Sequence, residues 1–281
     1  MVTTPQSRHK PRGSLADWLF PSTLKTVSTP LTDPLHPAGG RLRRYPLSMV
    51  DDFRRGAERV GEAAADAIAA VKPKLRGVSH EWAFFISLGL GAALIIAAKT
   101  PEATVAVTVY AVSLSALLGT SALYHRVDWK RPGVRRWMRR LDHSMIFFLI
   151  AGTYTPFALL VLNGTLADAI LVVVWAGAIA GAVVEMVWIE HPKWVAALIY
   201  MSLGWVAAIA FPGLWSEMGA AGTILVAVGG ILYTAGAVVY ATQRPNPSPR
   251  VFGYHEVFHA LVIAAAAAQF AAIAFFALPS T

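Results

Sequence analysis

The sequence contains no cysteine and few charged residues. Of its 281 residues, 14% are Asp, Glu, Lys or Arg and 56% are hydrophobic, and the mean hydropathy is +0.53. The lack of cysteine excludes disulfides, thiolate metal ligands and cysteine nucleophiles. A shortage of charge combined with a high apolar content is typical of a membrane protein rather than a soluble one.

The first thirty residues also lack the apolar core of a signal peptide, so no cleavable leader is expected. Residues 1–48 contain seven prolines among serine, threonine and basic residues. This composition cannot bury enough apolar surface to fold alone, and it predicts a disordered cytoplasmic tail. Over residues 49–76, apolar positions recur near helical spacing between charged residues. This pattern predicts an amphipathic helix on the membrane surface or, alternatively, a solvated linker helix.

Seven long apolar runs follow this region. They cover about residues 82–98, 103–124, 143–162, 166–189, 194–212, 220–241 and 255–278. Each run is long enough for a helix to cross roughly 30 Å of hydrocarbon at about 1.5 Å per residue. The sequence therefore predicts an all-α, multi-pass membrane protein in which residues 77–281 form a domain of seven transmembrane helices.

Basic residues are distributed unevenly around these runs. Ten Lys and Arg residues lie in the loops after the second, fourth and sixth runs, only Lys99 lies in the alternate loops, and thirteen more precede the first run. By the positive-inside rule, the N-terminus is expected in the cytoplasm and the protein in the plasma (inner) membrane. Topology and anionic lipid account for the net charge of +8, so no nucleic-acid partner is expected.

Four ionisable side chains fall on this expected cytoplasmic side. His125 ends the second run, Asp142 starts the third, and His255 and His259 start the seventh. Histidines spaced i, i+4 project from one face of a helix about one turn apart, so two imidazoles can bind one ion. Three neutral imidazoles and a water form a tetrahedral zinc site with one exchangeable position, as in catalytic zinc sites.

Two further polar groups fit such a site. Asp142 could orient or deprotonate the water, and Ser121, one turn before His125, could donate a hydrogen bond to a carbonyl oxygen or to the water. Each residue alone also has a structural interpretation. His125 could snorkel or cap a helix, Asp142 could be an N-cap or a counterion for nearby arginines, and Ser121 could serve helix packing.

Other polar residues in the apolar runs have less definite roles. His80, His143 and His191 are expected to be satisfied or solvated imidazoles at the membrane interface. Glu185 lies deep in the fourth run, where a carboxylate is costly, and the sequence does not identify its partner.

The segment HEVFH, from His255 to His259, also matches the HExxH motif, in which Glu256 would be the general base of an intramembrane metalloprotease. Such a protease commonly takes a third ligand from an LDG motif, whereas Asp142 is followed here by histidine. Glu256 also points about 100° away from His255 around the helix. The protease is therefore kept as an alternative.

Three segments carry a resemblance to a known family: SALYHR (121–126), LDHSMIFFLIAGTYTPF (141–157) and FGYHEVFH (252–259). Together they resemble the hemolysin III branch of the progestin and adipoQ receptor family. These are seven-helix proteins within a wider group of membrane hydrolases that includes alkaline ceramidases. The resemblance covers about residues 75–278. Two positions depart from the family pattern: Gln269 replaces a later histidine, and Ser79-His80-Glu81 replaces a Thr-His-Gly element.

The resemblance implies a zinc ion held by His125, His255 and His259, with Asp142 and Ser121 near the metal-bound water, and a cytoplasmic N-terminus. The expected function is zinc-dependent hydrolysis of an amide or ester in a membrane lipid. Two further alternatives remain besides the protease. One is a non-enzymatic regulator of membrane homeostasis, or a receptor, with structural zinc, and the other is a cytolytic membrane protein.

Overall fold

The computed structural model describes Gly56 and residues 73–280. In this part of the chain, helices account for nearly all of the ordered backbone, and the pairing of Ser248 with Phe252 is an isolated bridge. The predicted all-α class is confirmed. The predicted tail (1–48) and most of the predicted surface helix (49–76) lie outside the described residues. The end of that predicted helix, residues 74–77, is a turn.

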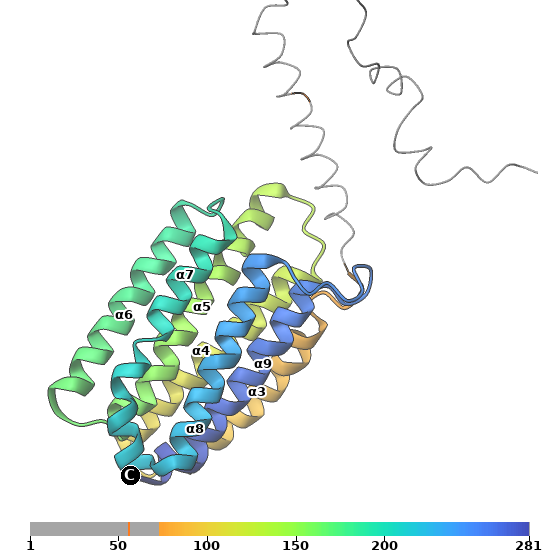
Figure 1. Cartoon of the computed structure of the whole chain (residues 1–281). Helices are drawn as coiled ribbons and strands as arrows, with labels where there is room; N and C mark the ends of the chain where they lie inside the picture. The colour runs from red at the N-terminus through yellow and green to blue at the C-terminus, as the bar shows by residue number, and fades with distance from the viewer. Residues whose placement is uncertain (1–55, 57–72, 281) are drawn as a thin grey trace, which may run out of the picture. The chain divides into compact units, whose positions relative to one another are not determined.

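The described helices pack side by side in a bundle (Figure 1). They are α3 (Val78–Ala97), α4 (Pro101–Arg126), α5 (Pro132–Leu160), α6 (Gly164–Val187), α7 (Lys193–Gly204), α8 (Ala207–Thr242) and α9 (Tyr254–Ala272), followed by η2 (Ile273–Ala277) and η3 (Leu278–Ser280). Six segments among the described residues are long and apolar enough to cross a membrane: α3, α4, α5, α6, Lys193–Thr242 and Tyr254–Ala277. The protein is an integral, multi-pass membrane protein.

The segment Lys193–Thr242 has 50 residues, which at about 1.5 Å per residue is more than twice the thickness of the hydrocarbon. The helix is interrupted between α7 and α8, where Trp205 and Val206 keep helical dihedral angles, and the backbone leaves the helical conformation at Gly219, where φ is 66° and ψ is −174°. Only glycine adopts this combination readily. The expected runs 194–212 and 220–241 lie on either side of Gly219. Counting the segment as one span yields six, and counting its two halves separately yields the expected seven.

The break between α7 and α8 is held by Tyr154 of α5. The tyrosine hydroxyl donates a hydrogen bond to the carbonyl oxygen of Gly204 at 2.6 Å and accepts one from the N–H of Ala207 at 2.5 Å. A helix break inside an apolar medium frees backbone groups that water cannot reach, so a side chain from a neighbouring helix has to satisfy them. Tyr154 has this role here.

The helix α5 begins earlier than expected. It starts at Pro132 and places Asp142 ten residues inside the helix, so the prediction that Asp142 starts this helix is wrong. Pro132 occupies the first turn, where a missing N–H costs nothing and the fixed φ suits a helix. The basic residues that follow Pro132 therefore belong to the helix rather than to a loop. Because α5 starts at Pro132, Asp142 is not a helix N-cap.

Small residues let α4, α5 and α6 approach closely. A Cβ added to Gly152 of α5 would lie 2.1 Å from the Ser113 hydroxyl oxygen of α4. A Cβ added to Gly181 of α6 would lie 2.2 Å from the Phe147 ring of α5. Close packing through small residues is common in membrane helices, where no hydrophobic force drives association. It holds Asp142 and the end of α4 in a fixed relation.

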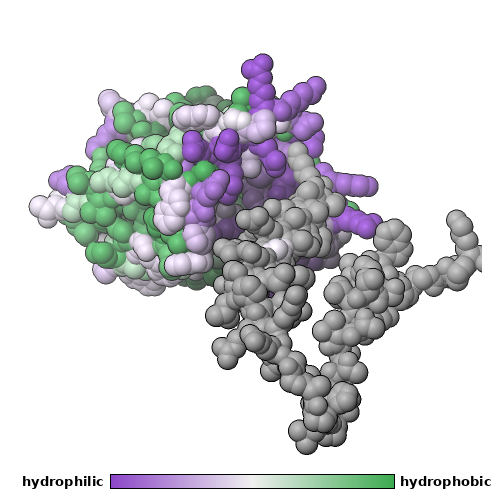
Figure 2. Space-filling view, turned by 90° about the horizontal axis from the view of Figure 1, so that it is seen from above, coloured by the Kyte–Doolittle hydropathy of each residue, from purple (hydrophilic) through white to green (hydrophobic). Residues whose placement is uncertain are grey.

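The surface has two parts. Large apolar side chains project outward from the helices, among them Ile96, Val187 and Phe275 with exposed fractions of 84%, 77% and 70%. Hydrophilic residues gather at one end of the bundle, and apolar residues cover much of the remaining visible surface (Figure 2). A lipid bilayer is the medium in which such an apolar surface is stable.

Replacing Tyr154 by phenylalanine should lower the free energy of unfolding by about 1–3 kcal/mol, because two backbone groups at the helix break lose their partner. Unfolding of the purified protein in mixed detergent micelles would measure this change. Tyr233→Phe is the matched control, since the Tyr233 hydroxyl is buried and has no hydrogen-bond partner among the described residues. Equal effects of the two substitutions would contradict the role of Tyr154.

Candidate metal centre

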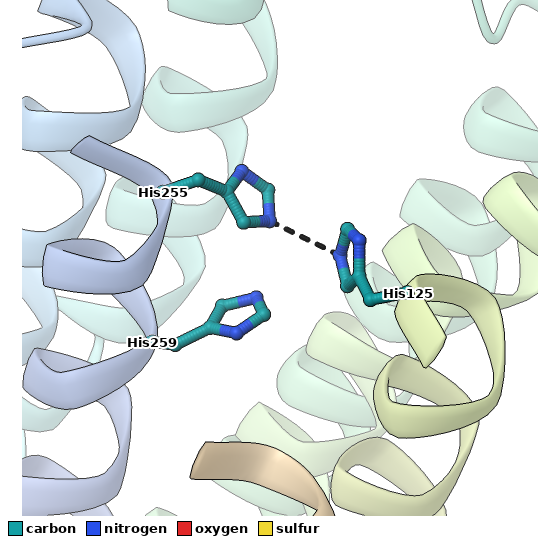
Figure 3. Close-up of side chains that lie close together, drawn as sticks. All are labelled: His125, His255 and His259. Atoms are coloured by element: carbon teal, nitrogen blue, oxygen red, sulfur yellow. Dashed lines mark hydrogen bonds between the residues drawn. The ribbon is translucent and has the colours of Figure 1, made fainter. Parts of the chain in front are cut away.

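His125, His255 and His259 meet inside the bundle. His125 lies in the last turn of α4, and the other two lie one turn apart at the start of α9 (Figure 3). The Nε2 atoms of His125 and His255 are 3.1 Å apart, and one ring nitrogen from each of the three residues lies within 4.8 Å of the others. All three side chains are buried. The predicted convergence of these imidazoles is therefore observed.

These three residues fit a metal ion. With bonds of about 2.0–2.1 Å, two nitrogens of a tetrahedral zinc site are about 3.3 Å apart, close to the separation of His125 and His255. The Nδ1 atom of His259 is buried without a hydrogen-bond partner in the described part of the chain. Buried imidazoles with incomplete hydrogen bonding are costly unless another group satisfies them, and a cation shared by the three rings would do so.

His80 of α3 supports this cluster from the side. Its ring stacks on that of His259, with a centroid distance of 3.7 Å and an interplanar angle of 9°. Among the described residues, neither of its nitrogens has a hydrogen-bond partner, and His80 is not one of the three residues that can share an ion. The expectation of a satisfied or solvated imidazole is wrong for His80, which is buried and stacks its ring on that of His259.

Asp142 and Ser121 lie beside the three histidines. Asp142 Oδ2 is 3.6 Å from His125 Nε2, and the Asp142 side chain also interacts with that of Ser121. Both residues are buried and line the same cavity as His255 and His259. The structure thus brings together all five residues predicted for the site. Asp142 reaches it from the third turn of α5 rather than from a helix end.

The N-terminal end of the described region ties α9 in place. Arg76 donates a hydrogen bond to Glu256 Oε1, while Glu256 Oε2 accepts the N–H of Gly253 at 2.7 Å. The backbone N–H of Lys74 donates to the carbonyl of Arg250 at 3.1 Å. Both carboxylate oxygens of Glu256 are therefore engaged in fixing the start of α9. Sequence analysis missed Arg76, because nothing in a local pattern pairs residues 180 positions apart.

A cavity of about 270 Å³ extends from this site between α5, α7, α8 and α9. Its wall is mostly apolar, and its polar groups include Asp142, Ser121 and His143 close to the histidine cluster and Gln269 elsewhere. Tyr154 and Phe157 also line it, as do residues of the α7–α8 break. Its volume is near the lower end of the range typical of small-molecule sites. The shape suits a narrow apolar ligand with one polar group.

Glu185 of α6 has partners that the sequence could not supply. Its Oε1 accepts a hydrogen bond from the Tyr200 hydroxyl at 2.8 Å and lies 3.0 Å from His191 Nε2. Its Oε2 lies 3.3 Å from His143 Nδ1. The expectation of satisfied imidazoles holds for His191. Its partner is another buried side chain rather than solvent.

Comparison with known proteins agrees with this arrangement. A family model described as "Haemolysin-III related" matches residues 68–270. The chain belongs to this family. Hemolysin-3 from Bacillus cereus is 33% identical over 214 residues, which cover 72% of this chain and 94% of that protein. The hemolysin-3 homolog of Bacillus subtilis (strain 168) is 33% identical over 172 residues, covering 61% and 77%.

A more distant relative comes from animals. The monocyte to macrophage differentiation factor of Homo sapiens is 28% identical over 168 residues, which cover 59% of this chain and 67% of that protein. The resemblance inferred from the three sequence motifs is therefore confirmed. The matched region of the family model includes every residue of the histidine cluster and of the Glu185 group.

His125→Ala, His255→Ala and His259→Ala should each remove most of the bound metal, because each leaves only two ligands. The loss should exceed the roughly 10–100-fold drop in affinity that removal of an outer hydrogen-bond partner causes. Metal stoichiometry of the purified variants would test this. His80→Phe keeps a flat ring against His259 but removes both nitrogens, so it should retain the metal. Loss of metal from that variant would make His80 a ligand.

Arg76→Gln should destabilise the protein by about 1–3 kcal/mol, because it leaves the Glu256 carboxylate buried without its cation. Arg76 keeps 20% of its side chain exposed, so the cost should be below that of a fully buried pair. Thermal unfolding would measure it. Arg126→Gln breaks the exposed Arg126–Glu81 pair and should have little effect. Adding Glu256→Gln to Arg76→Gln should restore stability, and a further loss would contradict this account.

Proposed function

We propose that this haemolysin-III related protein is a zinc-dependent hydrolase that cleaves an amide or ester bond in a membrane lipid. The observation that carries the proposal is the position of the histidine cluster against a largely apolar cavity, with Asp142 and Ser121 in the same wall. Three imidazoles suit zinc, and three protein ligands leave one position open for water, as in catalytic zinc sites. The apolar wall suits an acyl chain.

In the proposed reaction, a bound zinc ion would lower the pKa of a water molecule at the site and would polarise the carbonyl group of the bond to be cleaved. Asp142 accepts a proton from the attacking water, since its carboxylate lies beside His125 and faces the cavity. Ser121 donates a hydrogen bond to the oxygen of the substrate carbonyl as negative charge develops there. The apolar lining holds the chain of the lipid and excludes bulk water.

The proposal includes a topology of seven crossings with a cytoplasmic N-terminus. The length of Lys193–Thr242 and the non-helical conformation of Gly219 support two crossings within this segment. The uneven distribution of basic residues supports the orientation. In this arrangement the histidine cluster faces the inner leaflet, so the substrate would be a lipid that reaches this leaflet.

The metalloprotease alternative is disfavoured by the position of Glu256. Its two oxygens are engaged by Arg76 and by the Gly253 N–H, and Glu256 does not line the described cavity. A general base must reach the water whose proton it accepts. Glu256 is better explained as the residue that fixes the start of α9.

The purified protein, loaded with zinc and supplied with membrane lipids, should release fatty acid. Asp142→Asn should lower kcat by about 10²–10⁴-fold, the usual contribution of a general base. His255→Ala should abolish turnover together with zinc binding. Mass spectrometry of the released lipids would identify the bond that is cleaved. Glu256→Gln keeps one of the two acceptor oxygens, and the residue does not line the cavity, so this variant should change turnover little. Loss of activity in the Glu256→Gln variant would favour the metalloprotease alternative.

Two other functions have distinct outcomes in the same experiment. Retained zinc without turnover on any lipid would favour a non-enzymatic regulator or receptor. Leakage of dye from vesicles on addition of the purified protein would favour a cytolytic activity, which the names of the two Bacillus relatives suggest. Under the proposed function, intact vesicles that lack a cleavable lipid should not leak.

A further inference from the structure

The second buried polar group lies next to the proposed active site. It consists of Glu185 (α6), His143 (α5), His191 (the α6–α7 loop) and Tyr200 (α7). Glu185 is 1% exposed, and its two oxygens are shared among the other three side chains. A carboxylate and two imidazoles inside a membrane protein are costly, and residues of this kind commonly mark functional sites. The proposed function above uses none of them.

His143 connects this group to the cavity. Its ring lines the cavity, while its Nδ1 lies 3.3 Å from Glu185 Oε2. The two nitrogens of an imidazole point in divergent directions, so Nε2 is directed away from Glu185. His143 also lies near enough to Asp142 and His255 to interact with them electrostatically. His143 is thus an imidazole whose Nδ1 lies at ion-pair distance from a carboxylate, without a hydrogen bond between them in this structure, and whose Nε2 is available to a ligand in the cavity.

Asp142 and His143 approach the cavity from different sides. Neighbouring residues on a helix project about 100° apart, and both side chains line the same cavity. A hydrolytic site needs two proton-transfer groups at different places, one beside the attacking water and one beside the leaving group. Asp142 is close to the histidine cluster and suits the first place. His143 suits the second.

We propose that His143 is the acid that protonates the leaving group and that Glu185 is the positioning residue that orients it. This inference rests on the proposed hydrolase function. In the proposed step His143 starts as the imidazolium, with a proton on each nitrogen. Glu185 accepts a hydrogen bond from Nδ1–H and orients the ring so that Nε2–H faces the cavity, as a carboxylate orients a catalytic histidine in other enzymes. His191 and Tyr200 hold the Glu185 carboxylate in turn.

The proton transfers balance over the reaction. A water oxygen bonds to the acyl carbon, and a proton of that water passes to Asp142. The C–N or C–O bond then breaks, its electron pair goes to the leaving nitrogen or oxygen, and this atom takes the Nε2 proton of His143. The proton on Asp142 returns to His143 through water after products leave. The sum is an acid plus an amine or an alcohol, and both residues regain their starting forms.

Substrates with different leaving groups test this assignment directly. A fatty acyl alkylamide has a poor leaving group that must be protonated, whereas a 4-nitrophenyl ester of the same fatty acid releases a stable phenolate without an acid. His143→Gln should lower kcat on the alkylamide by about 10²–10⁴-fold and on the 4-nitrophenyl ester by less than about tenfold. Glu185→Gln should show the same pattern with a smaller loss.

The control is Arg126→Gln, which breaks the exposed Arg126–Glu81 pair and leaves the Glu185 group unchanged. Any loss in this variant should be equal on the two substrates. Bound zinc and thermal stability, measured in parallel, establish that each variant is folded. Equal losses on both substrates for His143→Gln would overturn the inference and leave the proposed hydrolase intact. A wild-type protein that cleaves neither substrate nor membrane lipids would overturn both.

A spectroscopic measurement tests the role of Glu185 without turnover. In protein labelled with ¹⁵N-histidine, the His143 resonances, assigned by their loss in His143→Gln, should show a proton on Nδ1. Glu185→Gln should shift the proton population of that nitrogen, and Arg126→Gln should not. An unprotonated Nδ1 in the wild-type protein would exclude the proposed orientation. This result does not depend on whether a substrate has been found.

Discussion

The architecture depends on the convergence of three imidazoles where the end of α4 meets the start of α9. Burying three histidines here is unfavourable unless their nitrogens are satisfied. The surrounding contacts keep the rings in place. His80 stacks on His259, and the Arg76–Glu256 pair fixes the first turn of α9. These contacts link α3 and the turn before it to the start of α9.

Polar groups are concentrated in two places, and an apolar cavity borders both. The first place holds the histidine cluster and Asp142, and the second holds the Glu185 group. His143 belongs to the second and lines the cavity beside the first. In a membrane interior, polar side chains that were only structural would more cheaply be replaced by apolar ones. The proposed hydrolysis of a molecule in the cavity would account for this arrangement.

Much of this was predictable from the sequence. Long apolar runs predict spanning helices, because the bilayer sets their length. The i, i+4 spacing of His255 and His259 predicts a shared ligand, because helical geometry places them on one face. Asp142 and Ser121 were included because Asp142 was expected on the same side of the membrane as the histidines and Ser121 lies one turn before His125, and the family resemblance then implied the same two residues. The residues of the site were therefore predictable, although their positions along the helices were less so.

The parts that were missed depend on contacts between distant segments. The start of α5 at Pro132 is hidden by the polar first turns of this helix, which interrupt the apolar run. The break before Ala207 depends on a hydroxyl from α5, and the partners of Glu185 come from three other segments. Apolar periodicity within one helix carries no information about which neighbouring helix supplies a partner. Such contacts become visible only when the bundle is assembled.

Gly77, which directly precedes α3, occupies a position that no other residue fits without strain. Its φ is 80°, and a Cβ added there would lie 2.6 Å from the Cβ of His125. Any other residue would be strained in its own backbone and would push on His125, one of the three histidines that could hold a metal. Truncated forms of the protein for biochemical work should therefore keep Pro73 and all residues after it, so that the turn packed against His125 remains intact.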